Sequence, residues 1–248
     1  MLSEELQNFR DNMRQPWSTM YYRLVWAQLG HAVEPKNLKI LDFGSGFGTT
    51  ANHFAKNNDV TAIEPNMEMI GERERENDYL QINGKIEKLK EFAGGSFDLV
   101  ICHNVLEFAE ERPAIVKEFS RVLKSGGILS VVKHNKTGRI IFKVVFENDV
   151  EEAVKLLDGE DSSNTFGKID YYDPEDLVRW SDGLKIEKIF GARILGMLQQ
   201  NNEAKYEPKW QEKMFELELK VCDMEPYKNI AFCHHVLLKK NKTQCDLL

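Results

Sequence analysis

The 248-residue sequence contains no long apolar run and no apolar segment near residue 1. No stretch approaches the ~20 apolar residues that a membrane-spanning helix needs. Residues 1–15 are polar, whereas a secretion signal carries a continuous apolar segment. We therefore expect a cytoplasmic protein with no membrane partner.

Cysteine is scarce as well, and the residues lie far apart in the chain. No two cysteines form a C-x-x-C pair, and no histidine lies at the spacing that zinc sites use. We expect no metal site and interpret the thiols as reduced and mostly buried. The cysteines are Cys102, Cys222, Cys233 and Cys245.

Positive charge is in deficit, with 33 Lys and Arg against 40 Asp and Glu and a net charge of -7. The chain therefore lacks the global attraction to nucleic acid that a basic protein has. One local basic cluster is present, and it is interpreted either as a nucleic-acid patch or as solvated surface. Its members are Lys133, Lys136, Arg139, Lys143 and Lys168.

An apolar run at residues 38–43 stops at three glycines spaced by two, Gly44, Gly46 and Gly48. Residues 49–54 can start a helix, so the pattern predicts a strand, a tight turn and a helix. Glycine permits the sharp bend and lets a ligand approach the backbone, and the helix N-terminus offers free N–H groups. We therefore expect a ligand to lie against this turn.

The glycine that would complete a dinucleotide-binding fingerprint is missing. That motif reads G-x-G-x-x-G, and Thr49 occupies its third glycine position. Further along, residues 60–65 read as a short strand that ends in Glu64, a carboxylate suited to ribose hydroxyls. These features predict a nucleoside site, with an NAD-dependent oxidoreductase as an alternative class of function.

Four segments resemble the successive motifs of class I S-adenosylmethionine-dependent methyltransferases. They are residues 41–48, Glu64, residues 97–103 and residues 121–127. The resemblance implies S-adenosyl-L-methionine as cofactor and a Rossmann-like α/β fold, with a mostly parallel seven-stranded sheet, helices on both faces and an N-terminal helical lid. The cofactor-binding residues that it implies are Arg23, Gly44, Ser45, Gly46, Gly48, Glu64, Met67, Gly84, Lys85, Ile86 and His103.

Three of these residues keep a structural alternative. Ile86 packs either on the adenine ring or in the core. His103 ends a strand, where open α/β sheets bind ligands, and either contacts a ligand or holds the following loop. Arg23 lies on a helical pattern at residues 19–31 and either meets the cofactor carboxylate or is solvated.

The order of elements predicts one core with additions. Strands alternate with helices from residue 37 to 132, which implies parallel pairing with right-handed crossovers. Beyond them we expect a helix at 140–158, a polar loop at 159–170, a helix at 174–181, a strand at 184–195, a long helix at 206–224 and a strand at 229–238. The divisions are a lid at 1–36, the cofactor-binding core at 37–132, an insertion that walls the acceptor site at 133–183, elements that complete the sheet at 184–240, and a tail at 241–248.

A narrower set of motifs is similar to the bacterial tRNA carboxymethoxyuridine methyltransferases, which form a methyl ester on the carboxylate of a modified wobble uridine. The matching motifs lie at residues 103–108, 134–138, 191–193 and 217–227. The resemblance implies tRNA as the methyl acceptor, and a small molecule is the alternative. A carboxylate is ionised near neutral pH, so methyl transfer to it needs no general base.

Basic residues are the candidates for acceptor binding. An arginine fork suits a carboxylate, so Arg193 is the first candidate, and Lys133 with His134 is the second. A salt bridge between elements is the alternative role of Arg193. A third class of function, a cofactor-binding protein without an acceptor pocket, also stays open.

Overall fold

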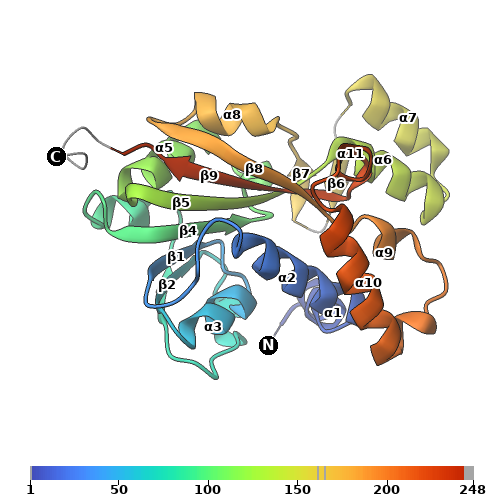
Figure 1. Ribbon diagram of the computed structural model, residues 1–248, viewed down its shortest axis with the longest axis horizontal. Helices are drawn as coiled ribbons and strands as arrows, with labels where there is room; N and C mark the ends of the chain where they lie inside the picture. The colour runs from blue at the N-terminus through green and yellow to red at the C-terminus, as the bar shows by residue number, and fades with distance from the viewer. Residues whose placement is uncertain (1, 161, 165, 243–248) are drawn as a thin grey trace.

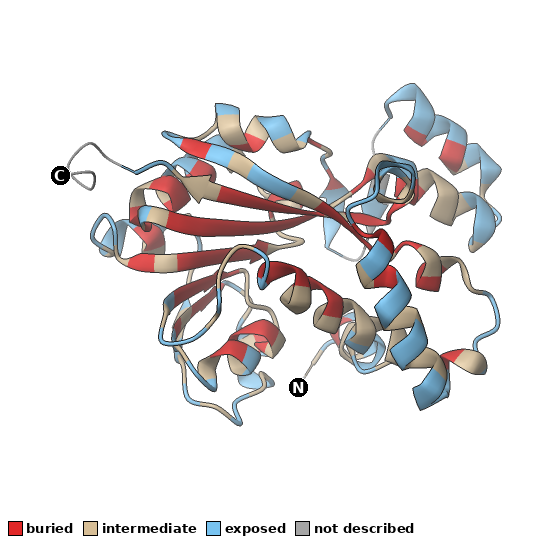
Figure 2. Ribbon diagram, in the orientation of Figure 1, coloured by how far each residue is buried: buried red, intermediate tan, exposed pale blue. Residues whose placement is uncertain are grey.

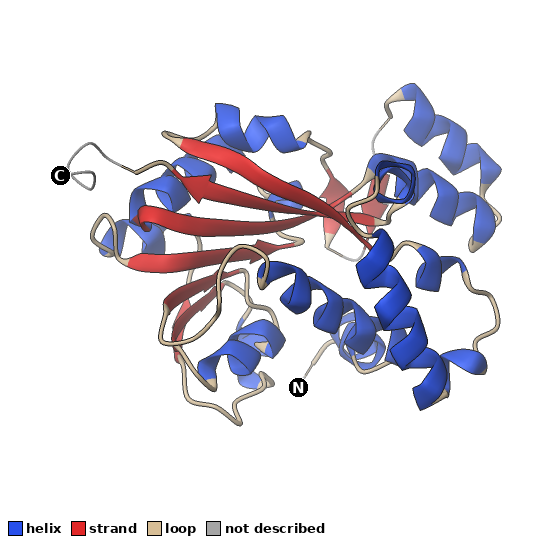
Figure 3. Ribbon diagram, in the orientation of Figure 1, coloured by secondary structure: helices blue, strands red, loops and turns tan. Residues whose placement is uncertain are grey.

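The computed structural model describes residues 2–160, 162–164 and 166–242. One seven-stranded sheet with helices on both faces lies at its centre (Figures 1 and 3), as the family resemblance implies. The strand order is β3-β2-β1-β4-β5-β9-β8, and a separate hairpin pairs β6 with β7. The strands are β1 Lys39–Phe43, β2 Asp59–Glu64, β3 Leu80–Asn83, β4 Phe97–His103, β5 Leu123–His134, β6 Ser162–Asn164, β7 Gly167–Ile169, β8 Leu184–Ala192 and β9 Cys233–Lys240.

The pairs among β1 to β5 are parallel, whereas β9 is antiparallel to both of its neighbours. Parallel strands are covered on both faces, which explains the continuous apolar run of β4, where Leu99 and Ile101 are fully buried. The carboxyl ends of these strands meet at one edge of the sheet. Gly44, Glu64 and His134 all lie at this edge.

Helices cover the two faces, and buried residues concentrate along the strands between them (Figure 2). On one face the ring of Phe119 in α5 packs on Phe43 of β1, with ring centroids 5.2 Å apart. On the other face Leu29 of α2 and Phe54 of α3 pack with Ile40 of β1. The helices are α1 Glu4–Met13, α2 Pro16–Leu29, α3 Thr49–Ala55, α4 Met67–Gly71, α5 Arg112–Val122, α6 Lys136–Val145, α7 Val150–Asp158, α8 Pro174–Arg179, α9 Leu195–Leu198, α10 Pro208–Val221 and α11 Glu225–Ile230, with 3-10 turns η1 Ile86–Glu91, η2 Leu106–Phe108 and η3 Ala204–Tyr206.

The N-terminal helices lie over the glycine turn and beside the sheet. α1 places Phe9 against Phe47 of the turn, with ring centroids 6.2 Å apart. α2 begins at Pro16, because proline suits the first positions of a helix, and it buries Leu24 and Leu29. The role of residues 1–36 as a lid over the cofactor remains a prediction.

The predicted helix at 140–158 is wrong, because two helices, α6 and α7, occupy the region. Asn148 between them has a left-handed φ of 51°, and the side chain of Asp149 accepts the backbone N–H of Glu152 at 2.9 Å, which caps α7. The predicted polar loop at 159–170 is also wrong in part, since it contains the β6–β7 hairpin.

Three predicted boundaries near the end of the chain differ from the structure. The strand predicted at 184–195 ends at Ala192, because Arg193 turns the chain with a left-handed φ of 60°. The helix predicted at 206–224 is α10, Pro208–Val221. The last strand begins at Cys233 rather than at 229, because Pro226 helps to start the short helix α11.

The thiols of Cys102, Cys222 and Cys233 are free and buried, as predicted. Cys245 and residues 243–248 of the predicted tail lie outside the described residues. Within the described ranges no helix is long and apolar enough to cross a membrane. The same ranges hold no group of three or more His, Cys, Asp or Glu side chains that could bind a metal ion.

Candidate cofactor and acceptor sites

The glycine turn follows β1 at the carboxyl edge of the sheet. Gly44, Gly46 and Gly48 all have positive φ, between 55° and 78°, a conformation that side chains other than glycine rarely adopt. A Cβ atom at Gly44 would lie 2.3 Å from Val105 Cγ2, so the close approach of the loop after the neighbouring strand β4 requires glycine there. At Gly46 the nearest atom to such a Cβ is the Met69 sulfur at 4.0 Å. The backbone at Gly46 is therefore open to a ligand.

Glu64 at the end of β2 is held against this turn. Its Oε2 accepts the backbone N–H of Gly46 at 2.8 Å, and its Oε1 accepts that of Asn66 at 2.9 Å. Burial raises the pKa of Glu64, and the two hydrogen bonds oppose this rise. The structure thus brings together the two features from which the nucleoside site was predicted.

Two buried polar groups beside the turn lack a partner in the described part of the chain. They are Oδ2 of Asp42, which lies in β1, and Oγ of Ser45, which lies between the first two glycines. Burial, followed by the charge of Glu64, raises the pKa of Asp42 to about 7. The sequence prediction included Ser45 but omitted Asp42. A carboxylate within an apolar strand next to a glycine turn is a signal for a ligand-binding residue that can be recognised in the sequence.

The residues around the turn fit S-adenosylmethionine. The backbone at Gly46 leaves room for a ligand, Glu64 can accept further hydrogen bonds from ribose hydroxyls, and Asp42 offers an acceptor without a partner in the described residues. A cavity of about 280 Å³ adjoins the turn at Phe47 and Thr49. Its other lining residues are Arg10, Met13, Arg14, Thr19, Tyr22, Arg23, Trp26, Glu72 and Glu74.

Arg23 lines this first cavity, but its guanidinium group points to α10. Its two terminal nitrogens donate to Glu212 at 2.8 and 3.0 Å, and its Cζ lies 4.5 Å from the centroid of the Phe215 ring. The salt bridge therefore occupies the group that was predicted to bind the cofactor carboxylate. Arg14, which the sequence prediction did not include, lines the same cavity.

The remaining predicted cofactor residues lie near the ends of β2 and β3. Gly84 donates its N–H to the carbonyl of Glu64 at 3.2 Å, and the N–H of Lys85 donates to Glu87 at 2.8 Å. Met67 is exposed at the start of α4. Ile86 packs against the core, the structural role that the sequence left open for it, and its contact with adenine remains a prediction.

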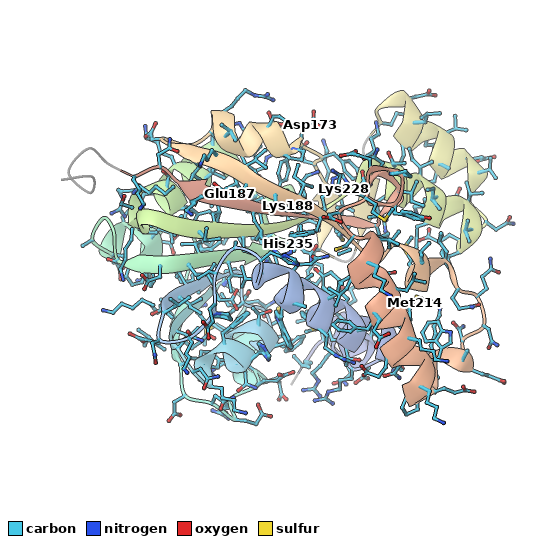
Figure 4. All side chains as sticks on the ribbon, in the orientation of Figure 1. Asp173, Glu187, Lys188, Met214, Lys228 and His235 are labelled. Atoms are coloured by element: carbon cyan, nitrogen blue, oxygen red, sulfur yellow. The ribbon has the colours of Figure 1, made fainter. Side chains whose placement is uncertain are left out.

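His103 belongs to a chain of hydrogen bonds inside the protein. Its Nε2 pairs with Ser130 Oγ at 2.8 Å, and the same hydroxyl pairs with Nε2 of His235 at 2.8 Å. His235, which Figure 4 labels between β9 and α2, pairs through Nδ1 with Gln28 of α2 at 2.9 Å. Burial lowers the pKa of His103 to about 3, so the ring is neutral. This arrangement favours the structural role of His103.

Both second-choice acceptor residues are engaged with other groups of the protein. Nδ1 of His134 lies 2.7 Å from Oε1 of the buried Glu107, which also accepts the backbone N–H of His134 at 3.1 Å. Lys133 is buried, donates to the carbonyl of His134 at 3.1 Å and lies 4.9 Å from the centroid of the Tyr172 ring. Burial lowers the pKa of Lys133.

Arg193, the first-choice residue, lines a second cavity of about 270 Å³. Its Cζ lies 4.7 Å from the centroid of the Phe232 ring, and its guanidinium group makes no ion pair within the described ranges. The alternative role of a salt bridge between elements is therefore not supported. The other lining residues are Asn12, Trp17, Met20, Tyr21, Leu24, Phe142, Phe146, Gly196, Met197, Asn202, Lys205 and Glu218.

α2 borders both cavities. Tyr22, Arg23 and Trp26 line the first, beside the glycine turn, while Tyr21 and Leu24 line the second. The helix that was predicted as a lid over the cofactor thus also contributes to the candidate acceptor site. Lys205 and the rings of Phe142 and Phe146 were not predicted as site residues, because they come from segments far apart in the sequence.

Known proteins share this domain and fold. Residues 41–131 match a methyltransferase domain family. A tRNA 5-carboxymethoxyuridine methyltransferase of Escherichia coli is 24% identical over 235 residues, which cover 89% of this chain and 88% of the relative. A ubiquinone biosynthesis O-methyltransferase of Xanthomonas axonopodis is 27% identical over 167 residues, or 64% of this chain and 67% of the relative.

A solved structure extends the comparison to the whole fold. The crystal structure of a SAM-dependent methyltransferase from Archaeoglobus fulgidus covers 94% of this chain and 98% of its own, with a TM-score of 0.59 and 16% sequence identity. The matches favour a methyltransferase over the oxidoreductase alternative. Residues 41–131 thus match a methyltransferase domain, the fold is that of class I methyltransferases, and the protein is an S-adenosylmethionine-dependent methyltransferase.

Proposed function

We propose that this protein methylates the carboxylate of a carboxymethoxyuridine in tRNA and forms a methyl ester. The observation that carries the proposal is Arg193, a guanidinium group without an ion-pair partner in the described chain, in a cavity walled by aromatic rings. Similarity to the Escherichia coli tRNA methyltransferase over most of both chains supports the same acceptor.

The protein's part in this reaction is to bind and position. S-adenosylmethionine supplies a methyl group on a positively charged sulfur, which a carboxylate can attack without prior loss of a proton. The open backbone at Gly46, with Glu64 and Asp42, holds the donor, and Arg193 orients the acceptor oxygen. Exclusion of water and in-line alignment then account for the rate.

The predicted basic patch is smaller than the sequence suggested. Lys133 and Arg139 are buried and cannot face a nucleic acid backbone, and Lys143 is paired with Glu147 at 2.6 Å. With a net charge of -7, tRNA binding has to depend on a limited basic surface. We therefore expect affinity for tRNA to be modest and to rely on contacts with the modified nucleotide.

The direct test uses purified protein, methyl-labelled S-adenosylmethionine and tRNA that carries carboxymethoxyuridine. We expect label in the wobble nucleoside, in a form that mild alkali releases because it is an ester. tRNA without the carboxymethoxy group is the matched control and should remain unlabelled. Absence of label in both tRNAs would refute the proposed acceptor.

A small-molecule hydroxyl group is the second candidate acceptor. The pair of His134 with buried Glu107 favours it, because such a pair can take the proton that a hydroxyl loses during methylation. The partial match to a ubiquinone biosynthesis O-methyltransferase agrees with this reading. Label that resists mild alkali and appears in a small-molecule fraction of cell extract would support it.

A further inference from the structure

The hydroxyl group of Tyr21 carries a proton that no described residue accepts. Tyr21 lies on α2, which packs against both β8 and α10 (Figure 1). The side-chain amide of Asn104 donates to the hydroxyl oxygen at 2.8 Å, so Tyr21 is the acceptor in this bond. A phenol hydroxyl both accepts and donates, and its capacity to donate is therefore left for another group.

The amide of Asn104 is oriented by its other end. Its Oδ1 accepts the thiol of Cys233, with 3.9 Å between sulfur and oxygen, which leaves Nδ2 to face Tyr21. The backbone N–H of Asn104 donates to the carbonyl of Val132 at 2.8 Å and holds the residue beside β5. Because Asn104 presents a donor to Tyr21, the hydroxyl proton has to point away from Asn104.

The hydroxyl keeps this proton at neutral pH. Burial raises the pKa of Tyr21 well above its usual range, and the nearby charge of Arg193 opposes this rise. Both residues line the second cavity. A neutral donor and a cation thus border the same space, a combination that suits an anionic ligand.

Tyr21 also lies close to the place where the methyl group has to be transferred. Val105, the residue after Asn104, approaches the glycine turn so closely that a Cβ atom at Gly44 would lie 2.3 Å from its Cγ2. Tyr22, the next residue on α2, lines the first cavity beside this turn. The hydroxyl of Tyr21 is therefore positioned between the candidate cofactor site and the candidate acceptor site.

We propose that the Tyr21 hydroxyl donates a hydrogen bond to the carboxylate of the methyl acceptor, beside Arg193, and that Asn104 is the positioning residue that directs it. The proposal rests on the proposed function and adds a second acceptor-binding residue to it. A carboxylate has about four lone-pair sites, so it can bind both donors and keep one lone pair for the methyl carbon. Donors from two elements, α2 and the end of β8, limit its rotation, and in-line attack needs a fixed orientation.

Binding of two nucleosides tests the proposal on the full-length protein saturated with S-adenosylhomocysteine. Calorimetry measures the affinities for 5-carboxymethoxyuridine and for uridine, and their ratio is the gain from the carboxylate. A hydrogen bond to a charged group changes an affinity on the order of 10- to 100-fold. Tyr21→Phe should reduce the gain by this factor and keep the affinity for uridine. Tyr206→Phe, which removes an exposed hydroxyl bonded to Gln15 at 2.8 Å, is the matched control and should keep the gain.

A double variant distinguishes the positioning role of Asn104 from support of the fold. Asn104→Gly removes the amide and suits the left-handed φ of 56° at this residue. It should reduce the gain when introduced alone and cause no further reduction together with Tyr21→Phe. A residue that only supports the fold would also lower the affinity for uridine. Circular dichroism at the assay temperature shows whether each variant is folded, and Asn104→Gly carries the test if Tyr21→Phe is not.

An undiminished gain in Tyr21→Phe would overturn the proposal. A weaker affinity of this variant for S-adenosylhomocysteine with an undiminished gain would also overturn it, because the hydroxyl would then bind the cofactor. The result is separable from the proposed function. Wild-type protein that labels tRNA, with an unchanged kcat/KM in Tyr21→Phe, would refute only the role of Tyr21. Wild-type protein whose gain depends on Tyr21 but that never labels tRNA would refute only the tRNA reaction, and wild-type protein without any gain would refute both.

Discussion

Asn104, the residue after β4, donates its side-chain amide to the hydroxyl of Tyr21 on α2, with 2.8 Å between the two atoms. Asn104 has a left-handed φ of 56°, which asparagine tolerates better than most residues. Tyr21 lines the second cavity, and its helix also borders the first. One hydrogen bond therefore ties the helix shared by both cavities to the carboxyl edge of the sheet.

Loss of this bond should loosen α2. Tyr21→Phe leaves the Asn104 amide unpaired, so the free energy of unfolding should fall by about 1–3 kcal/mol. Denaturant unfolding measures the change. Tyr206→Phe is the matched control, because its hydroxyl makes an exposed hydrogen bond of the same length, 2.8 Å to Gln15, and its loss should cost about 1 kcal/mol or less. Equal losses in both variants would contradict a special role for the Asn104 contact.

A side chain at Gly46 should block the cofactor. Gly46→Val places methyl groups on the open backbone of the turn, so affinity for S-adenosylhomocysteine should fall at least about 10-fold, as calorimetry can measure. Gly95→Val is the control, because Gly95 has a similar φ of 70°, has no described atom within 4 Å of the point where a Cβ would lie, and precedes β4 at the other edge of the sheet. Both variants carry the same backbone strain, so a drop in affinity confined to Gly46→Val would locate the ligand.

His134 separates the two acceptor classes. If the acceptor is a carboxylate, no base is needed, and His134→Gln should lower kcat less than about 10-fold without changing the pH profile. If the acceptor is a hydroxyl group, the same substitution should lower kcat about 10²- to 10⁴-fold, and Glu107→Gln should show a related loss. Steady-state kinetics across pH 6–9 with both variants distinguishes these outcomes.

Asp42 should make stability depend on pH. Burial raises its pKa from 3.8 to about 7, so the folded state holds more protons than the unfolded state between these values. The contribution of Asp42 is therefore fully favourable below the unfolded pKa and is lost as pH rises through about 7. Asp42→Asn does not titrate, so its stability relative to wild type should increase from pH 5 to pH 8.

Thermal unfolding at the two pH values measures this effect. Asp59→Asn, at the exposed start of the neighbouring strand, is the control and should differ from wild type by the same amount at both pH values. If the stability of Asp42→Asn relative to wild type stays constant or falls from pH 5 to pH 8, Asp42 is not buried as a neutral acid.

The core of the fold and the cofactor turn follow from local patterns. The sequence alone predicts the strand before Gly44 from its apolar run, and it predicts the carboxylate of Glu64 at the end of the next strand. Both predictions succeed because strand, turn and helix form within a few residues of one another. The split of residues 140–158 into α6 and α7 was missed. Its cause is the left-handed Asn148 followed by the capping Asp149, which interrupt an otherwise helical apolar pattern.

By itself, the sequence determined the parallel core and the glycine turn with Glu64, since each depends on the spacing of neighbouring residues, and the resemblance of its motifs to a known family indicated the methyltransferase class. Only the tertiary structure decided how distant side chains combine. It pairs Arg23 with Glu212, places His103 in a buried hydrogen-bond network with Ser130, and brings Arg193 and Lys205 to one cavity. Such pairings depend on the packing of α2, α6 and α10 against the sheet, and contacts between residues far apart in a chain leave no periodic trace in its sequence.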